Sequence, residues 1–217
     1  MKQFLFLLMV GILVTSVNAQ TFSDHYYQRK ALFESTPDTE NEIIFLGNSI
    51  TEGGDWKALF PNVNVVNRGI SGDVTAGILN RLSEVTSSQP KKIFLLIGTN
   101  DLARGKSKSY VLDHVASILH EIQKDSENTE IFLQSILPVN PKVGDKFSGH
   151  KSNQQLIVSV NHSLEELAKR SNVSFIDLHK RFSNAKGELK PKFTYDGLHL
   201  SKQGYKKWKR VLKPYVK

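Results

Sequence analysis

Residues 42–51 read Glu-Ile-Ile-Phe-Leu-Gly-Asn-Ser-Ile-Thr, an apolar run that passes directly into a turn containing Ser49. A short apolar run bounded by turn residues is typical of a strand that is buried on both faces of a parallel sheet. Comparable runs, short and partly β-branched, recur at wide spacing along the chain, at residues 63–66, 92–97, 130–135 and 173–178. The sequence therefore predicts five buried strands.

The segments between these runs have helical periodicity. The apolar residues of 109–124 and 152–170 recur on one stripe, which is typical of an amphipathic helix, and we also expect helices at 75–85 and 202–211. Strands that alternate with helices imply a parallel sheet covered on both faces, and right-handed crossovers leave few topologies. The expected fold class is α/β: a three-layer α/β/α sandwich with a five-stranded parallel sheet in the order 2-1-3-4-5, flavodoxin-like.

Residues suited to chemistry follow every predicted strand. Ser49 follows the first strand, the glycine-rich turn 69–73 the second, Asn100 the third, the long loop 138–151 the fourth, and Asp196 and His199 come after the fifth. Sites in open α/β sheets form beyond the carboxyl ends of the strands. We therefore expect these residues to meet at one edge of the sheet.

Ser49, Asp196 and His199 are the residue types of a serine nucleophile system. A serine hydroxyl needs a base to take its proton, and an acid at Nδ1 leaves Nε2 of the base facing the serine. Asp196 and His199 are three residues apart, so one helical turn would point both side chains toward the same space. The structural alternatives are a helix cap at Ser49, with Glu52 in capping-box spacing, and a helix N-terminus at Asp196.

Gly72 and Asn100 could supply N–H donors to an oxyanion, one from the backbone and one from a side-chain amide. Their structural alternatives are a turn glycine and a turn asparagine in left-handed geometry. His150, His162 and His179 lack the spacing of metal ligands, and neither Gly-x-Gly-x-x-Gly nor the Walker lysine pattern is present. We therefore expect no metal, no nucleotide and no other cofactor.

With Ser49, Gly72, Asn100 and His199 in this order, the chain resembles the SGNH hydrolases, also called the GDSL lipase/esterase family. The four blocks named for these residue types read Gly-Asn-Ser-Ile-Thr-Glu (47–52), Gly-Ile-Ser-Gly-Asp (69–73), Gly-Thr-Asn-Asp (98–101) and Asp-Gly-Leu-His (196–199). The resemblance runs from about residue 42 to the last predicted helix. Position 51 is Thr, which departs from the Gly-x-Ser-x-Gly elbow of the α/β-hydrolases.

The resemblance implies Ser49 as nucleophile, His199 as base and Asp196 as the acid that orients it. It also implies an oxyanion hole made by the N–H groups of Ser49 and Gly72 and the side chain of Asn100. The family usually has Asp where this chain has Asn48, so a charge near the nucleophile is lost. The blocks look most like those of platelet-activating-factor acetylhydrolase-like and carbohydrate acetylesterase members.

The first residues have the composition of an export signal. Lys2 precedes an apolar stretch, 4–14, and small residues occupy the −3 and −1 positions of a cut after Ala19. We expect a secretory signal peptide at 1–19, a single domain at 20–217, and a secreted or periplasmic location. The alternatives are a membrane anchor and a buried first helix. The chain has no cysteine, which excludes disulfides and a lipoprotein anchor.

The net charge is +8, and much of the positive charge lies in the last segment, 202–217. A surface for an anionic partner is one interpretation. The solvated side of a final helix, with Tyr205, Trp208 and Leu212 packed inward, is the simpler one and the one we favour. No nucleic-acid motif is present, so we expect neither nucleic-acid binding nor stable membrane insertion, while the oligomeric state stays open.

These observations predict a secreted serine esterase that removes short acyl groups, above all acetyl, from an oxygen ester through an acyl-enzyme. The expected partner is a small acylated substrate, most simply an acetylated glycan. The alternatives are a lysophospholipase or lipid acetylhydrolase, which the basic C-terminal segment would suit, and a catalytically inactive binding module.

Overall fold

The computed structural model describes residues 21–217, so the predicted signal peptide lies outside the described residues. Its centre is a five-stranded parallel sheet in the order β2-β1-β3-β4-β5, which confirms the predicted topology. The strands are β1 (Ile43–Gly47), β2 (Val65–Gly69), β3 (Lys92–Leu96), β4 (Glu130–Gln134) and β5 (Ser174–Ile176). Every residue of β1 is buried, as the apolar run predicts for a central strand.

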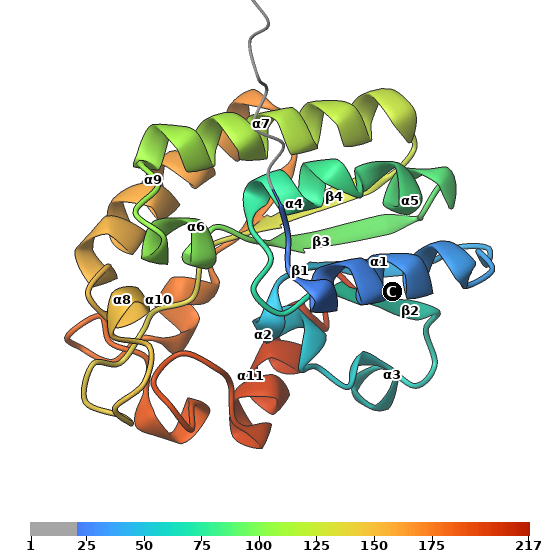
Figure 1. Ribbon diagram of the computed structural model, residues 1–217. Helices are drawn as coiled ribbons and strands as arrows, with labels where there is room; N and C mark the ends of the chain where they lie inside the picture. Colours follow the sequence, from blue (N-terminus) through green and yellow to red (C-terminus); the bar gives the residue numbers. More distant parts are fainter. Residues whose placement is uncertain (1–20) are drawn as a thin grey trace, which may run out of the picture.

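Helices cover both faces of the sheet (Figure 1). One layer is formed by α4 (Thr75–Asn80), α5 (Leu82–Ser87), α7 (Lys108–Asp125) and α9 (Gln154–Arg170). The other contains α3 (Trp56–Leu59) and α11 (Lys202–Leu212), with α10 (Leu178–Phe182) packed beside α11. The three-layer α/β/α sandwich is therefore confirmed. No helix within residues 21–217 combines the length and apolarity needed to cross a bilayer.

A ladder of stacked aromatic rings fills the layer beneath α3 and α11. Phe45, Phe94 and Phe132 are register partners on β1, β3 and β4, and their rings stack at 5.2 Å and 4.6 Å between centroids. Trp56 stacks on Phe45 at 3.8 Å, and Trp208 of α11 meets the ring of Trp56 edge-on at 4.8 Å. The ladder therefore fixes α11 against the sheet, as the inward spacing of the final helix predicts.

The segment predicted as one helix at 75–85 is two helices that meet at Arg81. Arg81 has φ −122° and ψ 14°, and its fully buried guanidinium pairs with Asp73 at 2.9 Å and donates to the carbonyls of Gly47 and Arg68. A residue with this backbone geometry cannot continue the helix. The buried ion pair therefore coincides with the break.

Helix α1 (Asp24–Ser35) is an element that the sequence did not predict. Only Tyr26 and Phe33 of its 12 residues are buried, so the chain carries no apolar stripe there. The helix packs through these two rings: the Tyr26 hydroxyl donates to the Gly77 carbonyl at 2.8 Å, and Phe33 lies beneath the guanidinium groups of Arg29 and Arg68.

Replacing Trp208 by Ala tests the aromatic ladder. The side chain is fully buried and its Nε1–H donates to Gln134 Oε1 at 2.8 Å, so the variant loses packing and leaves a buried acceptor unpaired. We expect a loss of roughly 3–5 kcal/mol in the free energy of unfolding, measured by urea denaturation. Val158→Ala, at a half-exposed position of α9, should cost less than about 0.5 kcal/mol. Similar losses in both variants would contradict this account of the fold.

Candidate active site

Ser49 is the first residue of a four-residue helix, α2 (Ser49–Glu52), which begins directly after β1. The helix is capped by Asn48, whose Oδ1 accepts a hydrogen bond from the Ile50 N–H at 3.0 Å. The capping role considered for Ser49 therefore belongs to its neighbour, and the Ser49 hydroxyl is available for another partner.

Gly47 lets the helix approach the sheet closely. A Cβ at this position would lie 2.4 Å from both the Leu96 carbonyl oxygen and Thr51 Oγ1. The glycine is therefore required by the packing of β1 between β3 and α2. The close neighbours of Gly47 are thus the protein's own atoms.

Ser49, His199 and Asp196 form a continuous hydrogen-bond chain. Ser49 Oγ lies 3.0 Å from His199 Nε2, and His199 Nδ1 lies 2.7 Å from Asp196 Oδ2. Because a carboxylate only accepts, Nδ1 carries the proton and Nε2 faces the serine as an acceptor. The two residues separated by 150 positions in the sequence therefore meet in the geometry that acyl transfer requires.

A tight turn, rather than the helical turn expected from the sequence, sets the direction of both Asp196 and His199. Asp196 Oδ1 accepts hydrogen bonds from the backbone N–H groups of Leu198 at 2.9 Å and His199 at 2.7 Å. Gly197, which follows Asp196, has φ +88°, a backbone conformation that interrupts a helix. Burial raises the pKa of Asp196, but the hydrogen bonds from His199 and the two backbone groups outweigh it and hold the pKa below its usual value. The acid therefore stays ionised beside the imidazole.

The predicted oxyanion donors line the same cavity as Ser49 and His199, which has a volume of about 660 Å³. Gly72 sits in the turn after β2 with φ +79°, and its carbonyl is held by the Arg104 guanidinium at 2.7 Å. Within residues 21–217 the backbone N–H groups of Ser49 and Gly72 donate to no other protein group. Both are therefore free to bind a negatively charged oxygen in the cavity.

Asn100 lies in α6 (Thr99–Ala103), after β3, with both ends of its amide held. Its Nδ2 donates to the Asp73 carbonyl at 2.8 Å, and its Oδ1 lies 2.9 Å from His150 Nε2. One Nδ2 hydrogen remains for a ligand. The left-handed residue of this turn is Gly98, with φ +117°, so the turn-asparagine alternative does not apply.

His150 is a site residue that sequence reasoning missed, since we considered it only as a metal ligand. It belongs to α8 (Ser148–Lys151) in the loop after β4. Because Asn100 Oδ1 is an acceptor, His150 Nε2 carries the proton of that hydrogen bond. Burial first, and then the neighbouring His199 and Arg104, lower the pKa of His150, so its ring is neutral near pH 7. The only signal in the sequence was its place in a loop at the functional edge of the sheet.

The loop 138–151 covers one side of the cavity and is tied internally. The Lys151 ammonium is largely buried and donates to the carbonyls of Val143 at 2.8 Å and Gly144 at 2.9 Å. Phe147, at φ +63°, places its ring edge-on to His199 at 5.0 Å. Within residues 21–217 no group of three or more His, Asp or Glu side chains is arranged to hold a metal ion. His162 and His179 do not line the cavity.

Glu52 links the turn of Ser49 to the turn of Gly72. Its Oε2 accepts hydrogen bonds from both the backbone N–H of Ser71 at 2.5 Å and the Ser71 hydroxyl at 2.6 Å. On its other side the carboxylate contacts His25 at 3.1 Å and Arg29 at 3.4 Å, both from α1. The N-terminal helix therefore supports the oxyanion turn through one carboxylate.

Comparison with known proteins agrees with this fold and site. The profile of the GDSL-like Lipase/Acylhydrolase family matches residues 45–207, so the chain belongs to that family and is a serine ester hydrolase of the SGNH type. Platelet-activating factor acetylhydrolase IB subunit alpha2 of Rattus norvegicus is 29% identical over 177 residues, which cover 78% of this chain and 73% of that protein. The family predicted from the four sequence blocks is confirmed.

Solved structures share the architecture. A Streptococcus pneumoniae protein described as a candidate platelet activating factor has a TM-score of 0.80 and 31% identity, with 89% of this chain and 93% of that chain covered. The acetyl xylan esterase AlAXEase has a TM-score of 0.66 and 20% identity, with 81% of this chain and 100% of that chain covered.

Variants of His150 test the geometry around Asn100. His150→Leu removes the donor to Asn100 Oδ1 and should lower kcat about tenfold, since one hydrogen bond that orients the amide is lost. His150→Gln restores an N–H donor and should recover most of the rate, with KM nearly unchanged in both.

Asn100→Ala removes the amide itself and should lower kcat about 10²–10³-fold. Ester hydrolysis under saturating substrate measures all three, and full activity of His150→Leu would contradict the role.

Proposed function

We propose that this enzyme hydrolyses short-chain oxygen esters, above all acetyl esters, on glycans. The observation that supports the reaction type is the hydrogen-bond chain from Ser49 through His199 to Asp196, with distances of 3.0 Å and 2.7 Å. The cavity beside it brings Gly72 and Asn100 next to the hydroxyl that would attack.

In the proposed reaction Ser49 Oγ attacks the ester carbonyl carbon while His199 Nε2 takes the hydroxyl proton. The oxygen that becomes negative is bound by the N–H groups of Ser49 and Gly72 and by Asn100 Nδ2. His199 then gives its proton to the leaving alcohol, and the acyl group stays on Ser49. Water attacks this acyl-enzyme with His199 as base, which releases the acid and restores the serine. Asp196 stabilises the imidazolium in both halves.

The residues that line the cavity are compatible with a sugar substrate. Beside the reacting groups it consists mainly of small or polar residues, and Phe147 and Leu198 are its large apolar side chains. Tyr195 is 66% exposed next to the site, and its ring lies nearly parallel to that of His199, 6.0 Å away. An exposed aromatic ring offers a flat apolar surface to the C–H face of a sugar. The shared fold with an acetyl xylan esterase is compatible with a glycan substrate for this enzyme.

A lipid ester is the second candidate. The observation that favours it is the similarity to the platelet-activating factor acetylhydrolase subunit, whose name gives platelet-activating factor as the substrate and acetyl as the group removed. Because that substrate also carries an acetyl ester, the two candidates share the reaction and differ in the leaving alcohol.

We further propose that the enzyme is exported after cleavage at Ala19, which N-terminal sequencing of the secreted protein would test.

Ser49→Ala tests the nucleophile. The variant should lower the kcat for p-nitrophenyl acetate by roughly 10⁴-fold or more, since no acyl-enzyme can form. It should also abolish covalent labelling by a fluorophosphonate probe, detected by intact-protein mass spectrometry. Ser148→Ala changes another serine of the same cavity and should still be labelled. Equal labelling of both variants would exclude Ser49 as nucleophile.

Tyr195→Ala tests the glycan. Loss of a stacking ring should raise KM for an acetylated xylo-oligosaccharide by roughly tenfold and leave p-nitrophenyl acetate hydrolysis unchanged, because that ester has no sugar. The wild-type enzyme should also prefer acetyl over octanoyl esters. Faster hydrolysis of a 2-acetyl phospholipid than of the acetylated oligosaccharide, with no effect of Tyr195→Ala on either, would favour the lipid candidate.

A further inference from the structure

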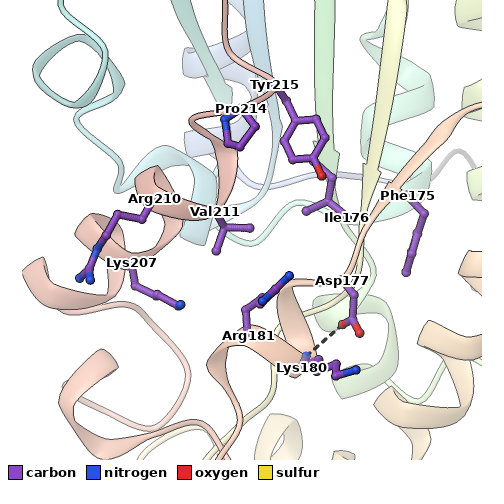
Figure 2. Close-up of a pocket in the computed structure, with 10 residues that line it drawn as sticks. All are labelled: Phe175, Ile176, Asp177, Lys180, Arg181, Lys207, Arg210, Val211, Pro214 and Tyr215. Carbon is purple, nitrogen blue, oxygen red and sulfur yellow. Dashed lines mark hydrogen bonds between the residues drawn. The ribbon is translucent and has the colours of Figure 1, made fainter.

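A second cavity lies beside the edge strand β5, away from the residues of the Ser49 cavity. It has a volume of about 580 Å³, and its lining comes from β5, from α10 and its cap Asp177, from the C-terminal half of α11, and from Pro214 and Tyr215, which follow α11 (Figure 2). Four of its side chains are basic: Lys180, Arg181, Lys207 and Arg210. The side chains of Lys207 and Arg181 extend into the space between α11 and α10. The two cavities share no lining residue.

Basic side chains outnumber acidic ones in this cavity. Within residues 21–217 none of the four basic side chains has a carboxylate oxygen within 4.0 Å. Asp177 is the one acidic residue in the lining, and its Oδ1 caps α10 by accepting the Lys180 backbone N–H at 2.9 Å. A group of like charges opposes folding, so an anionic ligand would remove an unfavourable interaction.

Lys207 lies near several other positive charges. It is half-buried, and burial first, followed by the positive charges of Arg210, Arg181, Lys190 and Lys192, lowers its pKa. No acidic group contributes to the shift. A perturbed titratable group in a cleft, with its cause identified, is typical of a ligand site. Lys180, Arg181 and Arg210 are exposed and Lys207 is partly buried, so a dissolved anion could reach all four.

The other walls of the cavity are apolar and partly aromatic, from Phe175, Val211, Pro214 and Tyr215. Aromatic rings suit the flat C–H face of a sugar ring, and cations suit a carboxylate. A uronic-acid sugar has both features. The volume is in the range of small-ligand sites. A bilayer surface would need protruding apolar side chains, whereas Phe175 and Val211 of this cavity are partly buried against the core.

We infer that this cavity binds an acidic oligosaccharide, with uronate carboxylates held by Arg181 and Lys207 and a sugar ring against Phe175 or Tyr215. The inference goes beyond the proposed esterase reaction, because it concerns a separate cavity and holds whichever ester is cleaved at Ser49. Guanidinium and ammonium groups form charge-assisted hydrogen bonds with carboxylates, so the charge of these two residues carries the affinity.

Isothermal titration calorimetry with a galacturonate trimer tests the inference, with neutral xylotriose as the comparison ligand. The wild-type protein should bind the trimer and not xylotriose, and the affinity should fall as salt is added. Arg181→Gln with Lys207→Gln should weaken binding about tenfold or more, and Lys207→Arg should retain it. Lys213→Gln with Lys217→Gln removes the same charge from exposed residues outside the cavity and should bind as the wild type does.

Two further readouts separate this inference from the esterase proposal. Arg181→Gln with Lys207→Gln should hydrolyse p-nitrophenyl acetate at the wild-type rate, and Ser49→Ala should bind the trimer normally. Equal affinity of the two double variants, equal binding of xylotriose, or no binding of the trimer would overturn the inference. Binding to vesicles of phosphatidylglycerol, but not to the trimer, would overturn it in favour of a membrane surface.

Discussion

The backbone of α2 lies against Gly69 of β2 so closely that a Cβ there would come within 2.1 Å of the Glu52 nitrogen. This contact joins the turn that carries Ser49 to the strand that leads into the turn of Gly72. It also brings the Glu52 carboxylate to the N–H and hydroxyl of Ser71. The nucleophile and one oxyanion donor are therefore placed relative to each other by a backbone contact that only glycine permits.

A second set of contacts fixes Asn100 from beneath. Its Nδ2 donates to the Asp73 carbonyl, and the Asp73 carboxylate pairs with Arg81, whose guanidinium also binds the carbonyls of Gly47 and Arg68 at the ends of β1 and β2. Burial raises the pKa of Asp73 to about 6, against the opposing effect of Arg81. The amide is thus held by groups that are themselves buried and paired. Donors fixed in this way need no reorganisation as charge develops.

The sheet and the meeting of Ser49, Asp196 and His199 at its edge could be predicted because buried strands leave apolar runs and parallel strands end on one side. The local geometry of the site, which depends on short helices and turns, could not be predicted. Helices α2, α6 and α8 have four or five residues, too few to show a period, and Gly197 turned an expected helical turn into a tight one. His150 was missed for the same reason, since its contact with Asn100 depends on the path of an irregular loop.

The family usually has Asp where this chain has Asn48. An aspartate there can both cap α2 through an oxygen and supply a negative charge, and Asn48 can only do the first. Its side chain is fully buried, and its Oδ1 keeps the hydrogen bond that caps α2, while within residues 21–217 its Nδ2 has no partner. Leaving a buried donor unpaired costs about 1–3 kcal/mol, so the amide is not a neutral replacement for stability. The cap geometry is retained and the charge is not. The negative charge next to the imidazole of His199 is instead that of Asp196, at 2.7 Å, and the placing of Ser49 depends on an acceptor oxygen at residue 48 rather than on an anion there.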